Sequence, residues 1–230
     1  MENIEVSYNN KIYPVEIEYK KVRHIRLMIY PEIRLRLISP NKHSLKYLAE
    51  FVKSKQKWLE KHIDKFEKRK EIESKFQETQ FKFLGKAYEK KIIQSNNVYS
   101  EILGSQFIIY SNEENNKELQ LLIEKKFLLS KAPEIIEPII DKYLILLKPY
   151  GISLKEVKYR YLKTQWGNCI KSKKKITLNI KLIHEDIKFI EYVILHELCH
   201  LKYANHSKQF YDFLSIFMPD WKESKRLIKK

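Results

Sequence analysis

Apolar and polar residues alternate in short runs over the first forty positions of the chain. The pairs Asn9-Asn10 and Pro31-Glu32, which are typical of turns, separate runs at positions 4–6, 15–19, 25–29 and 33–37. A period of two residues is typical of strands with one buried face. The pattern therefore predicts an antiparallel meander at the start of the chain.

Apolar residues at helical spacing come next. Ser44, a residue type that caps helices, precedes a single apolar stripe with lysines on the opposite face. This stripe predicts one long helix and consists of Leu45, Leu48, Phe51, Val52, Trp58, Leu59, Ile63 and Phe66. Strands are expected again at 81–84, 88–93 and 107–110, with Gly85 and Gly104 at turns.

Residues 113–147 have a mainly helical pattern, which we expect to be interrupted near Pro133 and Pro138. Gly151 closes this region. Two strands are then expected at 155–161 and 176–182, linked through a turn at Trp166-Gly167-Asn168-Cys169. The apolar run from Ile187 to Leu201 predicts a helix that is largely buried.

That helix carries the segment His196-Glu197-Leu198-Cys199-His200. Two residues four apart on a helix differ by about 40° around the axis and about 6 Å along it, so His196 and His200 can bind one ion. Glu197 then lies beside the metal without being a ligand. A zinc hydrolase needs such a pair of ligands, a third ligand, an open position for water and a carboxylate base.

His206 is the candidate for the third ligand. On a continuous helix it would lie about 240° around the axis from His200, so the chain must turn between them. Asn205 is a residue type that tolerates left-handed backbone, and either Asn205 or Ser207 can cap a following helix. The apolar spacing after residue 207 predicts that helix. Zinc is the expected ion, but three histidines also accept other divalent metals.

The spacing of the three histidines matches that of the metzincins, but Tyr203 replaces their glycine and Met218 follows too closely for a Met-turn. The order and spacing of several other motifs resemble the YgjP-like metallopeptidase family, relatives of zincin and SprT-type proteases. These motifs are Lys163 to Cys169, Ile176 to Asn179, Tyr192 to Leu201, Asn205 to Ser207 with Phe210, and Pro219 to Trp221, with weaker matches at 22–26, 39–40, 57–59 and 83–86.

This resemblance implies that His196, His200 and His206 hold zinc and that Glu197 is the base. It also implies a zincin-like module at the C-terminal end. The sequence has Gln165 and Asn168 where the family usually has arginine and serine, which puts substrate contacts in doubt. The expected fold is α+β, with a β-rich domain and long helix over residues 1–111 and a zincin-like metallohydrolase domain over 112–230.

The composition of the chain bears on its binding partners and on its location in the cell. The net charge of +16 is concentrated at the two ends: residues 1–75 have 18 basic and 11 acidic residues, and residues 151–230 have 17 and 8. A basic surface can attract nucleic acid or nucleotides, or can be a solvated exterior. The polar start of the chain and its two cysteines favour a cytoplasmic protein without disulfides or a membrane span. Cys169 and Cys199 are expected to pack in the interior.

The expected function is a metallopeptidase in which Glu197 activates a zinc-bound water to attack a peptide or protein substrate. A metal-dependent nucleotide pyrophosphatase and a nucleic-acid-associated module or protease are the alternatives. An extended peptide is expected to add to the strand at 176–182. The oxyanion needs a further donor. The candidates for it are Tyr161, Asn168, Asn179 and Tyr203.

Overall fold

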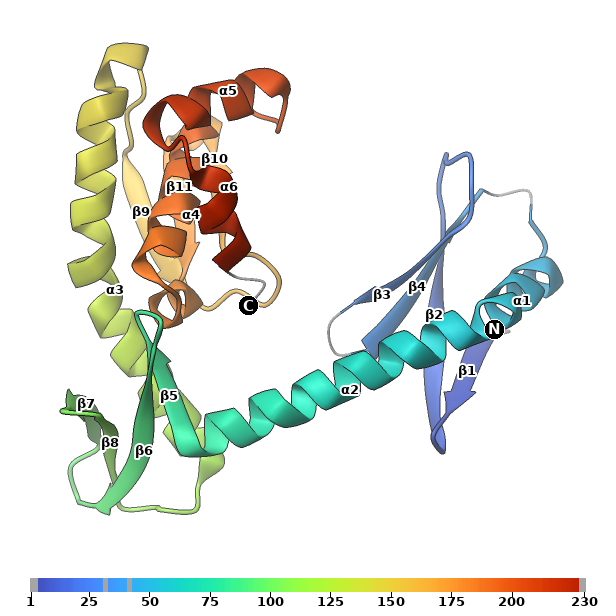
Figure 1. Ribbon diagram of the computed structural model, residues 1–230, viewed down its shortest axis with the longest axis horizontal. Helices are drawn as coiled ribbons and strands as arrows, with labels where there is room; N and C mark the ends of the chain where they lie inside the picture. The colour runs from blue at the N-terminus through green and yellow to red at the C-terminus, as the bar shows by residue number, and fades with distance from the viewer. Residues whose placement is uncertain (1–3, 31–32, 41–42, 228–230) are drawn as a thin grey trace. The chain divides into compact units, whose positions relative to one another are not determined.

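The computed structural model describes residues 4–30, 33–40 and 43–227, without the side chains of residues 73 and 77. The chain divides into two compact units, residues 1–77 and 78–230 (Figure 1). Each unit has its own hydrophobic core. Phe81 and Phe107 belong to the same core as Ile194, so residues 78–111 pack with the C-terminal part of the chain. The sequence-based division had placed them in the first domain.

The first unit contains a four-stranded sheet in the order β1-β2-β4-β3. Strands β1 and β2 form a hairpin, but β2 pairs in parallel with β4, so the expected antiparallel meander is wrong. After β2 the chain crosses over and forms β3, and β4 then inserts between β2 and β3. The turn expected at Pro31-Glu32 lies outside the described residues. The bounds are β1 (Ile4–Tyr8), β2 (Lys11–Tyr19), β3 (Arg26–Tyr30) and β4 (Arg34–Ser39).

Two helices cover one face of this sheet where one was expected, α1 (Leu45–Ser54) and α2 (Gln56–Thr79). Ser44 caps α1 as predicted, because its side chain accepts a hydrogen bond from the Tyr47 N–H. Lys55 departs from helical dihedrals and separates the two helices. Trp58 is 39% exposed, so it does not belong to the buried stripe. The helix residues buried in this core are Leu48, Val52, Leu59 and Ile63.

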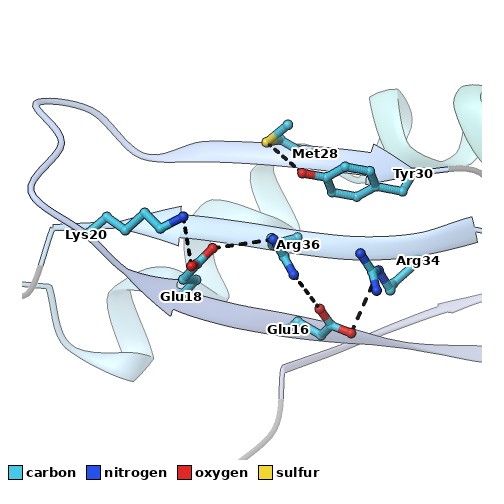
Figure 2. A network of polar contacts seen from close by, with 7 residues as sticks. All are labelled: Glu16, Glu18, Lys20, Met28, Tyr30, Arg34 and Arg36. Carbon is cyan, nitrogen blue, oxygen red and sulfur yellow. Dashed lines mark hydrogen bonds and ion pairs between the residues drawn. The ribbon is translucent and has the colours of Figure 1, made fainter. Parts of the chain in front are cut away.

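The other face of this sheet carries a network of opposite charges (Figure 2). Arg36 contacts both Glu16 and Glu18 at 3.5 Å, and Glu18 also pairs with Lys20 at 2.8 Å. Arg34 lies 3.9 Å from Glu16. The arginines on this face are therefore largely neutralised by glutamates of the neighbouring strand.

The second unit begins with a mixed sheet in the order β5-β6-β8-β7, in which β6 and β8 are parallel. The sequence analysis missed β7, an edge strand whose residues do not alternate between buried and exposed. The main chain joins this sheet to the region before the helix that carries His196 and His200, because Leu84 N–H donates to Ile183 C=O and Gly85 N–H to His184 C=O. The bounds are β5 (Gln80–Phe83), β6 (Lys86–Gln94), β7 (Tyr99–Leu103) and β8 (Gln106–Ser111).

Helix α3 (Lys117–Leu147) is continuous, so the interruption expected at Pro133 and Pro138 is wrong. A proline in a helix leaves the carbonyl four residues earlier without its helical partner. Pro138 is exposed and the buried stripe lies on the other side, with Ile136, Ile139 and Ile140. Packing of that stripe in the core offsets the lost bonds. A short 3-10 helix, η2 (Lys148–Tyr150), follows, and Gly151 closes it in a left-handed conformation, as expected.

A three-stranded sheet in the order β10-β11-β9 precedes the helix that carries His196 and His200. Three expectations are corrected here. The Trp-Gly-Asn-Cys segment is not only a turn, because Gly167 starts a strand. The strand expected to reach Leu182 ends at Asn179, and a 3-10 helix follows. That strand is central, so a peptide cannot add to it. The bounds are β9 (Glu156–Arg160), β10 (Gly167–Ile170), η3 (Lys171–Lys173), β11 (Lys175–Asn179) and η4 (Ile180–His184).

Three helices complete the second unit, α4 (Ile187–Cys199), α5 (Lys208–Phe217) and α6 (Trp221–Arg226) (Figure 1). Helix α4 contacts β10, β11 and α3 as well as α5 and α6, so it lies at the centre of this core. The α+β class is thus confirmed. Among the described residues, no helix combines the length and apolar character that a membrane span requires.

Candidate metal centre

Helix α4 presents the metal-binding motif from a rigid, buried element. The Asp186 side chain caps its first turn by accepting a hydrogen bond from the Lys188 N–H at 2.8 Å. Leu195 and Leu198, on either side of the first ligand, are fully buried. His196 lies in the last turn and His200 is the C-cap. Because the helix is packed on all sides, the positions of both imidazoles are fixed by the core.

The Nε2 atoms of the three histidines converge on one point. His196 Nε2 lies 3.2 Å from His200 Nε2 and 2.9 Å from His206 Nε2, and the distance between His200 Nε2 and His206 Nε2 is 3.2 Å. Tetrahedral zinc with Zn–N bonds of about 2.0–2.1 Å has nitrogen ligands roughly 3.3–3.4 Å apart. The three nitrogens therefore form nearly one face of a tetrahedron, which is the arrangement that a three-histidine metal site requires.

The protonation of the imidazoles also suits a metal. His200 Nδ1 lies 2.9 Å from the Tyr203 carbonyl oxygen. A carbonyl only accepts, so Nδ1 carries the hydrogen and the lone pair is on Nε2. Burial, followed by the charges of His200 and His206, lowers the pKa of His196 to about 3. The ring is neutral at physiological pH, as a ligand must be.

A single aromatic ring supports all three ligands. The fully buried ring of Phe210 lies with its centroid 4.9 Å from that of His196, 4.7 Å from His200 and 5.0 Å from His206. Phe210 is on α5, one turn after His206. It packs beneath the imidazoles and holds the third ligand against the two on α4.

The chain turns between His200 and His206 as predicted, and His206 lies just before α5. Ser207 caps this helix, because its hydroxyl accepts a hydrogen bond from the Phe210 N–H. Asn205 is not among the residues with positive φ, so the turn does not use the left-handed conformation expected there. His206 is exposed, whereas His196 and His200 are partly buried. The cluster is thus open to solvent on the His206 side.

Glu197 is buried beside this cluster. Its exposed fraction is 6%, and burial raises the pKa of its carboxyl group to about 7. The close neighbour is Gly167 of β10: a Cβ atom placed there would lie 2.8 Å from Glu197 Cγ and 2.9 Å from Oε1. Only glycine at position 167 leaves room for the carboxyl group of Glu197 in its observed position. A carboxyl group with a pKa near neutrality can both accept and return a proton.

Cys199 is buried in the core, and Cys169 is half-buried against it. Burial raises the pKa of Cys199 to about 12, and burial together with the charge of Glu197 raises that of Cys169 to about 11. A thiol with a raised pKa is a poor nucleophile and a poor ligand at neutral pH. Both cysteines are free. These properties fit the packing role expected from the sequence.

The four residues named as candidate oxyanion donors have different surroundings. The Asn179 amide is engaged on all sides: it donates to the Leu162 and Gln165 carbonyls, and its oxygen accepts from Leu162 N–H and Lys181 N–H. It has no free donor for a substrate. Instead, it fastens the segment that leads into β10 to the end of β11.

The other candidates lie elsewhere. The Tyr203 ring packs against Phe213 at 5.5 Å, and its carbonyl is engaged by His200. Tyr161 lies beneath the ammonium groups of Lys125 and Lys181. Alternation along β10 places Asn168 on the face opposite Gly167, away from Glu197. An oxyanion role for Asn168 or for the Tyr203 hydroxyl stays a prediction.

An aromatic stack beside the site was missed by the sequence analysis. Tyr192 stacks on Trp221 with centroids 6.3 Å apart, and Trp221 stacks on Tyr211 at 4.8 Å. The two ends of the stack contact His196 and His206. Tyr192 precedes the first ligand by four residues and was noted only as part of an apolar run. The spacing of four residues on one helix was the signal in the sequence that could have predicted the contact between Tyr192 and His196.

Two histidines and a glutamate on a buried helix, with a third histidine before the next helix, form a possible three-histidine metal site, an arrangement that metallopeptidases use. The sequence places the chain within that class. Residues 23–230 match the family described as YgjP-like, metallopeptidase domain. The chain belongs to the YgjP-like family, and the resemblance inferred from its motifs is confirmed.

Two solved structures are similar to part of the chain. They are the metallopeptidase zymogens abylysin of Pyrococcus abyssi (24% identity, TM-score 0.37) and jannalysin of Methanocaldococcus jannaschii (26%, 0.36). Each match covers 40% of this chain, with 90% and 92% of the respective archaeal chains. No curated protein matches the chain.

Proposed function

We propose that this protein is a zinc-dependent metallopeptidase with His196, His200 and His206 as ligands and Glu197 as the general base. The convergence of three Nε2 atoms within 3.2 Å of one another, beside a buried carboxyl group, carries the proposal. Membership of a metallopeptidase family supports a hydrolytic reaction. When bound, zinc would lower the pKa of a water molecule to near 7 and polarise the scissile carbonyl.

In this proposal each residue of the chain has a separate task. The three histidines hold the ion through neutral nitrogens, and Phe210 keeps them together. Glu197 takes a proton from the attacking water and returns it to the leaving amine, which a carboxyl group with a pKa of about 7 can do. Gly167 leaves the space that this carboxyl group occupies.

Strand β10 replaces the central strand as the expected place for an extended substrate. It is an edge strand beside α4, and β11 pairs with only one of its sides. Trp166 C=O accepts from Asn179 N–H, so alternation along the antiparallel pair turns the main-chain groups of Gly167 and Cys169 toward the open edge. A peptide added there as a strand would pass beside Glu197.

The first prediction separates metal binding from turnover. We expect the purified protein to bind about one zinc ion per chain. His200→Ala should lose the metal, because two ligands remain. Glu197→Gln should keep the metal and lose at least a hundredfold in hydrolysis, because the base is gone. Metal analysis by mass spectrometry and the cleavage of a denatured protein substrate measure both effects.

The same preparations test the alternatives on nucleoside triphosphates. Hydrolysis of triphosphates that Glu197→Gln abolishes, without cleavage of denatured proteins, would replace the peptidase by a pyrophosphatase. Full metal content in His200→Ala would show that the histidine cluster is not the metal site. A Lys126→Ala variant serves as the control, since this residue is exposed on α3 and is not a proposed ligand.

A further inference from the structure

The first unit has a groove between a strand edge and a helix. Residues of β1 form one wall, and residues of α1 with the start of α2 form the other, enclosing about 540 Å³. Strand β1 is at the edge of its sheet, with β2 on one side only. The groove lies wholly within residues 4–59 and has no part in the metal centre.

The main chain of β1 offers hydrogen-bonding groups to this groove. The hairpin loop is Asn9-Asn10, with both residues at positive φ, so the flanking pair Tyr8 and Lys11 closes a two-residue turn. Alternation from that pair leaves Glu5 and Ser7 with N–H and C=O groups that point away from β2. Pro14, opposite Glu5, has no N–H, which agrees with this register.

The side chains along the groove make it apolar in the centre and basic at the rim. Ile4 and Val6 are turned to the helix side of the sheet, where they are buried. Ala49 is an exposed, small residue on the facing helix, and it leaves the space open. Lys46 and Lys53 flank Ala49, about 10 Å apart along the helix axis. Both are exposed, and neither is ion-paired with a described residue.

These lysines differ from the arginines on the outer face of the same sheet. Arg34 and Arg36 already contact Glu16 and Glu18 (Figure 2). Lys46 and Lys53 at the groove are therefore available to a partner, whereas these two arginines are engaged. A strand edge next to an apolar groove is suited to a polypeptide rather than to a nucleic acid, because main-chain bonds and alternate side chains can both be satisfied.

We propose that this groove binds an extended peptide as an additional strand on β1, independently of the metal centre. The peptide has the pattern acidic, any, apolar, any, acidic. Its main chain bonds to Glu5 and Ser7, its apolar side chain lies over Ala49, and its two carboxylates pair with Lys46 and Lys53. Side chains two positions apart on the strand share a face, which places all three on the helix side.

The test uses the full-length protein and a fluorescein-labelled peptide containing Glu-Thr-Val-Thr-Glu, with binding followed by fluorescence anisotropy. A peptide with lysines in place of the two glutamates is the charge control. We expect the acidic peptide to bind at micromolar concentration and the basic one at least tenfold more weakly. Absence of binding up to 1 mM acidic peptide, or equal affinity for the two peptides, would overturn the proposal.

Three variants separate the contributions of the strand edge, the apolar groove and the rim charge to peptide binding. Ser7→Pro removes an outward N–H without breaking the β1–β2 ladder, Ala49→Trp fills the groove, and the double variant Lys46→Glu with Lys53→Glu reverses the rim charge. Each should weaken binding at least tenfold. Lys57→Glu with Lys61→Glu makes the same charge change on exposed positions outside the groove and should bind within twofold of the wild type.

The variants must first be folded, which circular dichroism and thermal unfolding establish. If Ser7→Pro unfolds the first unit, Ala49→Trp and the rim variant decide, since both change exposed helix positions. Unchanged binding in these two would overturn the proposal. Light scattering of the free protein tests whether a second copy of the chain occupies the groove instead of a peptide. A dimer that Ser7→Pro dissociates would assign the edge to self-pairing and also overturn the proposal.

Discussion

The carboxyl group of Glu197 lies against a residue that has no side chain. A Cβ on Gly167 would come within 2.8 Å of Glu197 Cγ, closer than real Cβ contacts, so Gly167→Ala must displace the carboxyl group. We expect this variant to keep its metal and to lose at least tenfold in kcat, because a shifted base transfers the proton less well. Hydrolysis assays and metal analysis measure the two effects.

Ile145→Ala is the control, since this residue is on α3, outside the site, and is 73% exposed. It should leave kcat within about twofold, as expected for a surface change away from the site. Loss of metal in Gly167→Ala, or undiminished kcat, would contradict the positioning role that the close contact assigns to this glycine.

The raised pKa of Glu197 also predicts a pH effect on stability in the metal-free protein. A folded pKa of about 7, above the ordinary 4.5, means that the folded state holds a proton that the unfolded state has lost. Its contribution to stability is present below pH 4.5 and is lost as the pH rises through 7. Glu197→Gln should therefore be more stable than the wild type at pH 8, by about 3 kcal/mol, and similar at pH 4.5.

Urea unfolding with a chelator at both pH values measures this difference. Glu223→Gln, a change of an exposed glutamate, is the control and should show no such pH-dependent gain. If Glu197→Gln gained as much stability at pH 4.5 as at pH 8, burial of the charged carboxylate would not be the cause.

At the scale of single residues, the cluster of three histidines could be predicted because its members are close in the sequence. His196 and His200 share a helix, and the third ligand needed only a turn before the next helix. Gly167 could not be found in this way, since its contact with Glu197 joins segments 30 residues apart. The role assigned to Asn179 failed for the same reason, because its partners lie on a distant loop.

Among the elements, the contact between β5 and η4 connects the sheet β5-β6-β8-β7 to the segment that leads into α4. His184 is part of it: its Nδ1 lies 2.5 Å from the Lys82 carbonyl oxygen and its ring packs against Phe81. Burial lowers the pKa of this imidazole, the main-chain contact opposing it. The unfolded chain therefore binds a proton more readily than the folded one.

The contribution of His184 to stability is thus present above the ordinary pKa of 6.5 and is lost as the pH falls below it. We expect the free energy of unfolding to decrease on acidification from pH 7 to pH 5, and His184→Asn to show a smaller decrease. Urea unfolding at the two pH values measures this decrease in the free energy of unfolding. His24→Asn, at an exposed position between β2 and β3, is the control, and an identical slope in His184→Asn would contradict this origin.

The pattern of hydrophobic positions predicted which segments are strands better than how they pair. A period of two residues places β2 and β4 correctly but cannot reveal that they are parallel, because alternation is the same in both directions. Edge strand β7 has little burial on either face and gave no periodic signal. Helix α3 continues through two prolines because tertiary packing outweighs their local cost.

For the whole molecule, the division into two units was not readable from the sequence. The strands at 80–111 resemble those of the first unit in pattern, yet Phe81, Phe107 and Ile109 are buried in the core of the second. Their assignment depends on which apolar surface they meet. In contrast, among the side chains that the structure describes in the second half of α2, none belongs to either buried core, and Ile72 is 69% exposed.

Two separate cores predict two unfolding transitions. The proposed metal site lies in the second unit, so zinc should raise the midpoint of that unit's transition and leave the other unchanged. Calorimetry of the full chain with zinc and with a chelator measures both midpoints. His200→Ala should abolish the difference between the two conditions. A single transition, or a zinc-dependent shift of both, would instead mean that the two units unfold cooperatively and that α2 transmits stability between them.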